Sequence, residues 1–412
     1  MNSIIIQTKI DILKYGVNFK PYDMFTNYKN IEKYKTKKIK IKPIRKDNEV
    51  YDMSTDSNIL PSEIIISNNN YSSIVKLRYS STSPLEIKII NNKFYLYKND
   101  IKLEIDIKLV KAYEILNENT PFILNNEYTK IKDYVDIVGI DRISILFFEG
   151  CYNWTCGKAC KFCDLHPKEI KDKVVKPTIN NLKHYNNNVE KWWKESKKDY
   201  FKGIQYSISK IVNNIDFPHK HLFFMAGNLP TIKDVWDIAE ETITDMSSYL
   251  NLEEFDNYLN IAPHDNIERL KRIKKLGIKQ VQYNLEIGNM DLFEEICPGK
   301  MKYKKFIEKL KEAVGIFGFG NVRSNFVFGL QDKEDLLEEI NSLASYGIVA
   351  DYSVFQPKRN TPFQDKSAPS FDDVIDFSKK LIKIYKKYNF KPIFCSLSSR
   401  SSIINELYDK YK

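Results

Sequence analysis

Strand-type and helix-type segments alternate from about Asp141 onward, and this alternation constrains the fold more than any other feature. The strand-type runs lie at 142–148, 221–225, 258–261, 280–286, 322–328 and 351–356. The helix-type segments lie at 231–250, 266–276, 302–317, 333–346 and 371–388. In the second of these helices, Ile267, Leu270, Ile273 and Leu276 recur at the spacing of one buried face. Strands joined through helices run parallel, so we expect about six β/α units around a parallel sheet.

This pattern predicts an α/β fold, specifically a partial (β/α)6 TIM-type barrel over residues 139–365. Residues 366–412 are expected to form a C-terminal helix and tail that complete the barrel. A long polar helical region at 179–213 precedes the second strand. In such barrels the chemistry lies on the loops that follow the carboxyl ends of the strands.

Residues 1–138 lack this rhythm and are expected to form an N-terminal accessory domain, β-rich or α+β. Short β-branched or aromatic runs lie at 63–67, 73–79, 85–90, 93–97 and 101–107. Asn91-Asn92 reads as a hairpin turn. Nothing in this half resembles a module that can be named.

The formal net charge of +10 is a weak guide to partners. The chain is rich in Lys, Asn, Ile and Tyr, as AT-biased genomes produce. Its densest basic run, 29–46, holds only one arginine, Arg45. We favour a solvated face over a polyanion contact there.

The chain shows neither a signal-peptide pattern at its start nor an apolar stretch of membrane-spanning length. We therefore expect a cytoplasmic protein with reduced thiols and no membrane partner. Four of the six cysteines fall within one short segment. In a reducing compartment such a cluster indicates a metal site before disulfides.

Three of these thiols, Cys156, Cys160 and Cys163, lie on one loop directly after the first strand. Iron–sulfur clusters are usually held by four thiolates, so three from one loop would leave one iron of a [4Fe–4S] cluster open. The amino and carboxylate groups of S-adenosylmethionine (SAM) can chelate such an iron. A zinc site would normally need a second cysteine pair or histidines, and His166 is near only in sequence.

The segment CGKACKFC resembles the CxxxCxΦC signature of the radical SAM superfamily, with Phe162 in the aromatic slot that packs near the adenine. The resemblance implies reductive cleavage of SAM to a 5′-deoxyadenosyl radical that abstracts hydrogen from a substrate. It also implies an electron donor such as flavodoxin or ferredoxin.

Later strand ends are similar to the biotin synthase-like branch of that superfamily. Ala226-Gly227-Asn228 occupies the slot of the GGE-like motif that holds the SAM amino group, although a plain strand-to-helix turn is an alternative. Asn284 and Glu286 resemble the strand-end residues that contact the methionine and ribose parts of SAM. Alternate strand residues share a face, so both can point inward; a structural polar pair is the alternative.

The fifth strand, with Arg323 and Ser324, resembles the V-x-S…G-L-x-E segment of the same branch, but Gln331-Asp332 departs from that pattern. The sixth strand leads into a P-x-x-G-T-P-like loop, in which Asn360 stands for the glycine. That change is tolerable where φ is positive. The resemblance covers about residues 141–362, and the cysteine motif is its most specific part.

Several smaller signals stay open. Lys300 is a candidate partner for the SAM carboxylate or a solvated lysine, and Cys297 is a weak catalytic candidate as hydrogen donor, with a small buried residue favoured. Cys151, Cys297 and Cys395 would reach a second cluster only if the fold gathered them. The histidines at 219, 221 and 264 flank strand ends and are more often structural than functional.

We therefore predict a radical SAM enzyme that acts on a small molecule. Three alternatives remain: a substrate of RNA or peptide recruited by residues 1–138, transfer of an aminocarboxypropyl group from SAM, or a non-enzymatic scaffold or sensor. Polar residues that converge opposite the cysteine loop would argue against the scaffold.

Overall fold

The computed structural model describes residues 3–19, 31–39, 50–51, 58–69, 71–80, 82–124, 126–165, 176–358, 360–393 and 397–410. The chain divides into two compact units. The first unit is Met1–Tyr113, Val327–Leu337 and Tyr352–Lys412, and the second unit is Glu114–Phe326 and Glu338–Asp351. The division into 1–138, 139–365 and 366–412 stays a prediction.

A seven-stranded sheet dominates the second unit. Its strands lie side by side in chain order: β13 (Asp136–Val138), β14 (Arg142–Leu146), β15 (His221–Met225), β16 (Asp256–Asn260), β17 (Gln280–Gln282), β18 (Val322–Phe328) and β19 (Ile348–Val354). The pairs from β14 to β18 are parallel, and β13 joins antiparallel to β14. The predicted α/β alternation with parallel strands is confirmed.

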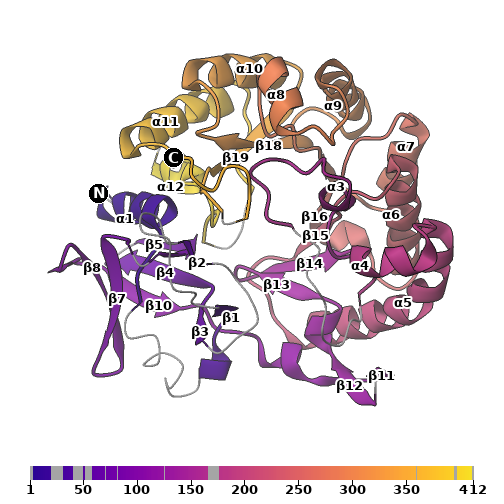
Figure 1. Cartoon of the computed structure of the whole chain (residues 1–412), viewed down its shortest axis with the longest axis horizontal. Coiled ribbons are helices and arrows are strands. Elements are labelled where there is room, and N and C mark those ends of the chain that lie inside the picture. The colour runs from indigo at the N-terminus through magenta and orange to yellow at the C-terminus, as the bar shows by residue number, and fades with distance from the viewer. Residues whose placement is uncertain are drawn as a thin grey trace. The chain divides into compact units, whose positions relative to one another are not determined.

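Helices connect these strands, and Figure 1 shows α5, α6, α7 and α9 on the outer side of the sheet. They are α3 (Tyr152–Thr155), α4 (Ile179–Leu182), α5 (Val189–Asn214), α6 (Ile232–Ser247), α7 (Ile267–Lys275), α8 (Met290–Ile296), α9 (Tyr303–Phe317) and α10 (Lys333–Ser345). Side-chain caps fix where several begin: Thr231 accepts a hydrogen bond from the Asp234 N–H, and Asn266 from the Glu268 N–H. The helical region expected at 179–213 is split because Asn186 and Asn187 take positive φ.

The core of the second unit lies between the sheet and these helices. The strand residues Ile143, Ile145, Leu222 and Phe224 are fully buried. Helices α5, α6 and α9 each bury an apolar face, and α5 alone buries Trp192, Trp193 and Tyr200 among its nine buried residues. The helices cover the sheet but not the carboxyl ends of its strands. Loops follow those ends, and the cysteine motif lies on one of these loops.

The first unit combines small antiparallel sheets with helices at both ends of the chain. Its strands are β1 (Thr36–Ile39), β2 (Val50–Tyr51), β3 (Asn58–Pro61), β4 (Glu63–Asn68), β5 (Tyr71–Lys76), β6 (Tyr79–Ser80), β7 (Leu85–Ile90), β8 (Lys93–Lys98), β9 (Ile101–Lys102) and β10 (Asp106–Leu109). Helix α1 (Ser3–Tyr15), which the sequence reading did not identify, packs on β5 and α11 (Phe371–Lys387). Helix α12 (Ile404–Lys410) packs on α11. The turn at Asn91-Asn92 has two positive φ values, as a tight hairpin requires.

Several strand boundaries differ from the sequence prediction; β14, for example, ends at Leu146 and β16 begins at Asp256. Strand β17 ends at Gln282 instead of residue 286, although Glu286, with φ +69°, still makes an isolated parallel bridge to Phe326. Strand β19 begins at Ile348, three residues earlier than predicted. At Asn360 the predicted positive φ is present, at +60°.

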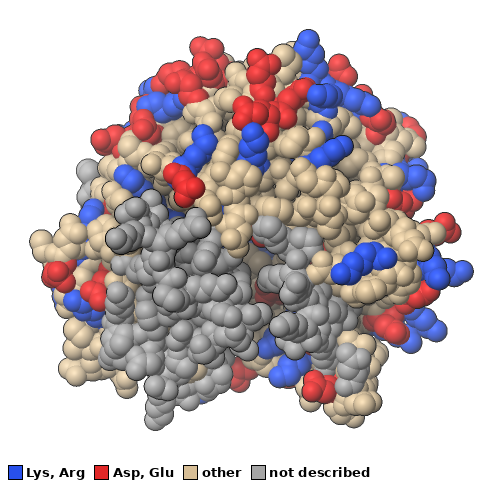
Figure 2. Space-filling model, viewed as in Figure 1, with Lys and Arg blue, Asp and Glu red and all other residues tan. Residues whose placement is uncertain are grey.

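Basic and acidic side chains alternate over the face of the described residues in Figure 2, without one continuous basic patch. Within the part of the chain that the structure describes, no helix combines the length and apolar character that a bilayer crossing requires. Arg45, His166 and Cys395 lie outside the described residues.

Candidate active site

The cysteine loop, residues 151–165, begins five residues after β14 ends. It contains only the short helix α3, so the three motif cysteines lie on irregular backbone. Cys156 is exposed, and Cys160 and Cys163 are partly buried. This position, at the carboxyl end of a parallel strand, is where α/β folds place ligands.

The segment after β15 holds one side of this loop. The Tyr152 N–H donates to the Asn228 carbonyl at 2.8 Å, and the Asn228 N–H donates to the Cys151 sulfur at 3.4 Å. A Cβ atom on Gly227 would lie 2.3 Å from the Gly150 carbonyl oxygen. The glycine is therefore required for close approach of two backbones, which gives the A-G-N motif a structural role whether or not it also binds SAM.

The segment after α8 holds the other side. The Lys161 N–H donates to the Ile296 carbonyl at 2.9 Å, and Lys161 Nζ lies 2.7 Å from Glu295 Oε1. A Cβ atom on Gly299 would lie 2.3 Å from Asn153 Nδ2.

The three thiols of the motif have different surroundings. Cys156 Sγ donates to the Asn153 carbonyl at 3.7 Å, and Cys163 Sγ accepts from the Leu165 N–H at 3.5 Å. The neighbouring Cys297 thiol and burial hold the pKa of the Cys160 thiol well above its usual range. Burial also raises the pKa of the nearby Cys151 thiol.

The donor chemistry of this loop fits an iron–sulfur cluster. Three thiols on one irregular loop, one of them exposed, match the preference of such clusters for cysteine thiolates. Among the described residues no three His, Cys, Asp or Glu side chains converge as the ligands of a metal ion would. The assignment of Cys156, Cys160 and Cys163 as ligands therefore stays a prediction based on donor type and spacing.

A charged pair lies beside the cysteine loop. Lys300 Nζ donates to Glu286 Oε1 at 3.1 Å and to the Asn284 carbonyl, and the lysine and glutamate side chains are only 16% and 13% exposed. Burial alone would lower the pKa of Lys300, but the negative charge of Glu286 raises it above its usual value. The structure thus brings together Cys160, Lys300, Glu286 and Asn284, four residues that the sequence singled out.

Asn325 is a neighbour that the sequence reading missed. Its Nδ2 donates to Glu286 Oε2 at 3.4 Å, and its N–H donates to Asn284 Oδ1 at 3.2 Å. Gln282 Nε2 also donates to Asn284 Oδ1, at 2.7 Å. The sequence contained one signal for Asn325. Arg323 and Asn325 are two residues apart on β18, so their side chains share one face of the strand.

Arg323 and Ser324 are differently placed. Arg323 is 3% exposed and makes a bidentate ion pair with Asp351, both N–O distances being 2.7 Å. The buried Ser324 hydroxyl accepts from the Leu285 N–H at 2.9 Å. Both side chains have structural partners, so their predicted contact with SAM stays a prediction without support from this geometry.

The remaining predicted residues lie at or near strand ends. Phe162 and Ala226 are partly buried, and the Ala226 N–H donates to the Asn260 carbonyl at 3.3 Å. His264 Nδ1 accepts from the Asn266 N–H at 2.8 Å, and burial lowers the pKa of His264. His264 therefore has a structural role, because its hydrogen bond closes the turn that precedes α7.

The ring of His219 lies beside the ring of His221, and Nε2 of His219 is 3.3 Å from the carboxylate oxygen Oδ2 of Asp256. Both histidines belong to the amino-terminal end of β15, opposite the carboxyl ends where the cysteine loop lies. A role for them in the candidate active site is therefore not supported.

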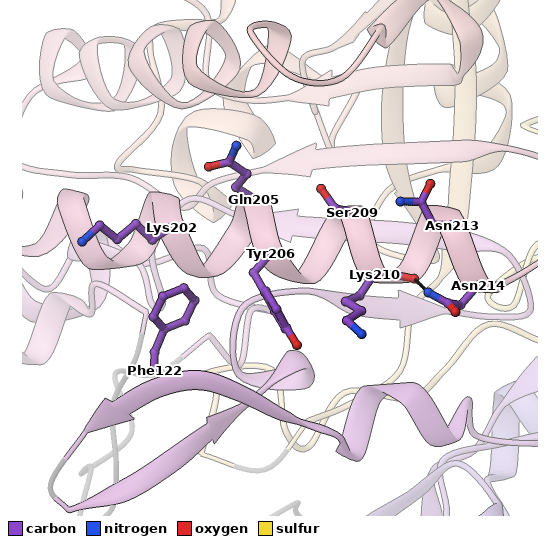
Figure 3. Close-up of a pocket in the computed structure, with 8 residues that line it drawn as sticks. All are labelled: Phe122, Lys202, Gln205, Tyr206, Ser209, Lys210, Asn213 and Asn214. Atoms are coloured by element: carbon purple, nitrogen blue, oxygen red, sulfur yellow. Dashed lines mark hydrogen bonds between the residues drawn. The ribbon is translucent and has the colours of Figure 1, made fainter.

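A cavity of about 570 Å³ lies along α5, between that helix and the hairpin of β11 (Asn119–Leu124) and β12 (Glu127–Lys130). Figure 3 shows Phe122 facing Tyr206 across it, with Lys202 and Lys210 to either side. Helix α5 leads into the amino end of β15. Since chemistry in α/β folds lies at the carboxyl ends, this cavity is not the candidate active site.

The chain matches no protein-family model. It is 22% identical over 255 residues to the bacteriochlorophyllide c C-7(1)-hydroxylase of Chlorobaculum limnaeum. The match covers 60% of this chain and 60% of that protein, so the chain spans less than two thirds of this relative.

The radical SAM superfamily is supported for this chain. The match adds to the cysteine motif, which had predicted the same superfamily of enzymes. The biotin synthase-like branch stays a prediction.

Three solved structures are also similar to the chain, at lower likeness. The FeFe-hydrogenase maturase HydG from Carboxydothermus hydrogenoformans is 17% identical with a TM-score of 0.39, covering 60% of this chain and 51% of that chain. Coproporphyrinogen III oxidase HemN from Escherichia coli is 12% identical with a TM-score of 0.36, covering 63% and 56%. Methylornithine synthase PylB is 13% identical with a TM-score of 0.39, covering 65% and 75%.

Proposed function

We propose that this chain is a radical SAM enzyme that cleaves SAM reductively and acts on a small-molecule substrate. One observation carries the proposal: a loop with three thiols follows β14 directly, and segments after two other elements, β15 and α8, hold its backbone. A loop fixed on both sides is suited to place a cofactor reproducibly. We further propose that the parallel strands form the partial (β/α)6 barrel expected from the sequence, with residues 1–138 as an accessory domain.

The proposed cluster ligands are Cys156, Cys160 and Cys163, which leaves the fourth iron to SAM. When bound, the [4Fe–4S] cluster and SAM supply one-electron cleavage of a carbon–sulfur bond, which yields a 5′-deoxyadenosyl radical able to abstract hydrogen. The electron comes from an external donor, for which a flavodoxin or ferredoxin is proposed.

The residues beside the loop suit the polar groups of SAM. The Lys300 ammonium is proposed to bind a carboxylate, and Glu286 to accept hydrogen bonds from ribose hydroxyls. Their mutual contact at 3.1 Å keeps both charges compensated in a part-buried position when neither holds a ligand. Asn284 is proposed to share this task, and Phe162 to cover the adenine.

Further contacts are proposed for the backbone after β15. The carbonyl of Asn228 already accepts from the Tyr152 N–H, so the carbonyls of Ala226 and Gly227 are the groups proposed to accept from the SAM amino group. Arg323 and Ser324 are proposed to support the site from behind, through Asp351 and the Leu285 N–H.

A small-molecule substrate is supported by the curated relative, whose name describes a hydroxylase of bacteriochlorophyllide c. Recruitment of RNA or peptide by the accessory domain has no corresponding observation. The convergence of Lys300, Glu286, Asn284 and Asn325 beside the cysteine loop argues against a scaffold without a cofactor pocket.

Anaerobic reconstitution with iron and sulfide, followed by dithionite and SAM, tests the proposal. We expect about four irons per chain, cluster absorbance and 5′-deoxyadenosine. The serine variants of Cys156, Cys160 and Cys163 should each lose both iron and product. Cys151→Ser keeps a group that can accept from the Asn228 N–H, and it should retain both.

Two results would contradict the assignment. Zinc in place of iron in the wild-type protein would remove the mechanism, and iron loss in Cys151→Ser would remove the three-ligand scheme. Mass spectrometry of the nucleoside product separates the proposal from aminocarboxypropyl transfer, which leaves methylthioadenosine.

A further inference from the structure

The hairpin of β11 and β12, which forms one wall of the cavity along α5, is fixed against that helix. A Cβ atom on Gly203 would lie 1.8 Å from Cε1 of Tyr134, so only glycine lets this ring lie against α5. The Tyr134 hydroxyl lies 3.2 Å from the hydroxyl of Thr129, which in turn donates to the Phe122 carbonyl at 3.1 Å. Thr129 and Tyr134 are both buried. These contacts hold Phe122 at a set distance from α5, so the cavity between them is formed by the fold itself.

Two aromatic rings line this cavity from its two sides. Phe122 reaches toward α5 from the hairpin, and Tyr206 reaches toward the hairpin from α5 (Figure 3). Their centroids are 6.0 Å apart and their planes are inclined by 81°. Both side chains are only partly buried. The pair therefore offers aromatic surface on which a planar ring can stack.

Two lysines at the cavity have no carboxylate partner. Among the residues that the structure describes, neither Lys202 nor Lys210 forms an ion pair, and no aspartate or glutamate lines the cavity. Lys197, on the same helix, lies by contrast 2.8 Å from Glu241. Lys210 Nζ is 5.9 Å from the centroid of the Tyr206 ring. An anionic group bound by Lys210 would therefore lie beside a ring stacked on Tyr206.

A row of uncharged polar side chains completes the lining. Gln205, Ser209 and Asn213 recur every four residues, so they follow one another along one side of α5, the upper side in Figure 3. All three are exposed. An amide group carries both a donor and an acceptor, as the edge of a nitrogen heterocycle or a pair of ribose hydroxyls requires.

We propose that this cavity binds a nucleotide, with its base against Tyr206 and Phe122 and its phosphates at Lys202 and Lys210. Rings and unpaired ammonium groups in one cavity match a ligand that is aromatic at one end and anionic at the other. The volume of about 570 Å³ lies in the range of small-molecule sites. Helix α5 leads into the amino end of β15, so the nucleotide is a ligand distinct from the substrate of the candidate active site. The inference is independent of the proposed function.

Isothermal titration calorimetry of the full-length chain with ATP tests the proposal. Adenosine lacks the charge and tripolyphosphate lacks the ring, so each should bind at least about tenfold more weakly than ATP. Tyr206→Leu removes the stacking ring and should weaken ATP binding about tenfold, whereas Tyr206→Phe keeps the ring and should bind like the wild-type protein. Lys210→Met should weaken ATP binding about fivefold. Lys198→Met is the matched control, because this exposed lysine of α5 does not line the cavity, and it should leave the affinity unchanged.

Four results would overturn the inference. The first is the absence of binding at millimolar ATP. The second is binding that neither Tyr206→Leu nor Lys210→Met weakens, because the nucleotide then occupies another place, such as the proposed SAM site. The third is tripolyphosphate that binds as tightly as ATP, which shows an anion contact without recognition of a base. The fourth is an equal loss of affinity in Tyr206→Leu and Tyr206→Phe, which shows that stacking on the ring contributes nothing.

Discussion

Lys9 and Glu406 form an ion pair inside the first unit, between α1 and α12. Lys9 Nζ lies 2.5 Å from Glu406 Oε1, and both side chains are 0% exposed. Lys9 Nζ also donates to the hydroxyls of Ser73, at 3.1 Å, and Ser398, at 3.0 Å. One buried ammonium therefore links the two ends of the chain to strand β5.

Replacement of Lys9 by Met removes the charge and keeps a side chain of similar length and helix propensity. The carboxylate of Glu406 then stays buried without its counter-ion, which costs about 3 to 5 kcal/mol. The free energy that protects α1 from local opening should fall by this amount. Amide exchange in α1 should become about a hundred- to a few-thousand-fold faster.

Hydrogen exchange read by mass spectrometry on peptides from residues 3–15 measures this change. All four tryptophans, at 154, 192, 193 and 236, belong to the second unit, so tryptophan fluorescence gives an internal control that should not move. A second control is Lys271→Met, which breaks an exposed pair with Glu268 and should cost less than about 1 kcal/mol.

The double variant Lys9→Met with Glu406→Leu removes both charges and should recover most of the loss, because an apolar pair can replace a buried ion pair. Two results would refute the argument from an unpaired buried charge. One is amide exchange in α1 that is as slow in Lys9→Met as in the wild-type protein. The other is exchange that is faster in the double variant than in Lys9→Met.

Three further predictions concern the second unit. Gly227→Ala would press a Cβ atom against the backbone that begins the cysteine loop, so iron uptake on reconstitution should fall below half, whereas Gly315→Ala, whose Cβ meets no atom within 4 Å, should leave it unchanged. Asp351→Asn leaves the buried Arg323 without its carboxylate and should lower the free energy of unfolding, followed by tryptophan fluorescence in urea, by about 3 kcal/mol; an effect below about 1 kcal/mol would contradict this. Burial raises the pKa of Glu339, so the folded state binds its proton more tightly than the unfolded state and stability falls as pH rises above about 4.3, the usual value. Glu339→Gln should flatten this part of a plot of melting temperature against pH, and an unchanged slope would contradict the assignment.

The sequence contained most of the secondary structure of the second unit, because periodicity is a local property. Apolar residues at helical spacing gave α7, and buried runs of β-branched and aromatic residues gave β14 and β15. Strand boundaries were predicted less well. Strand β17 is shorter than its composition suggests, and Glu286, in the remainder of the predicted strand, takes a positive φ that a glutamate seldom adopts.

The candidate site was only partly readable for the same reason. The cysteine spacing is contained in eight consecutive residues, and its chemistry follows from three thiols on one loop. The neighbours of that loop come from other elements: Asn228 follows β15, and Cys297 and Gly299 follow α8. A lone cysteine or glycine carries no signal of which distant backbone it will contact.

By itself, the sequence determined the alternating α/β pattern and the thiol loop, since both are set by residues that are neighbours along the chain. Only the tertiary structure decided that Lys9 pairs with Glu406, that Asp351 neutralises Arg323 and that Cys297 lies against Cys160. In each case burial is what makes the pairing matter. A polar group withdrawn from water needs a partner within the fold. Along the chain that partner can be very distant, as Glu406 is from Lys9, or much nearer, as Asp351 is to Arg323.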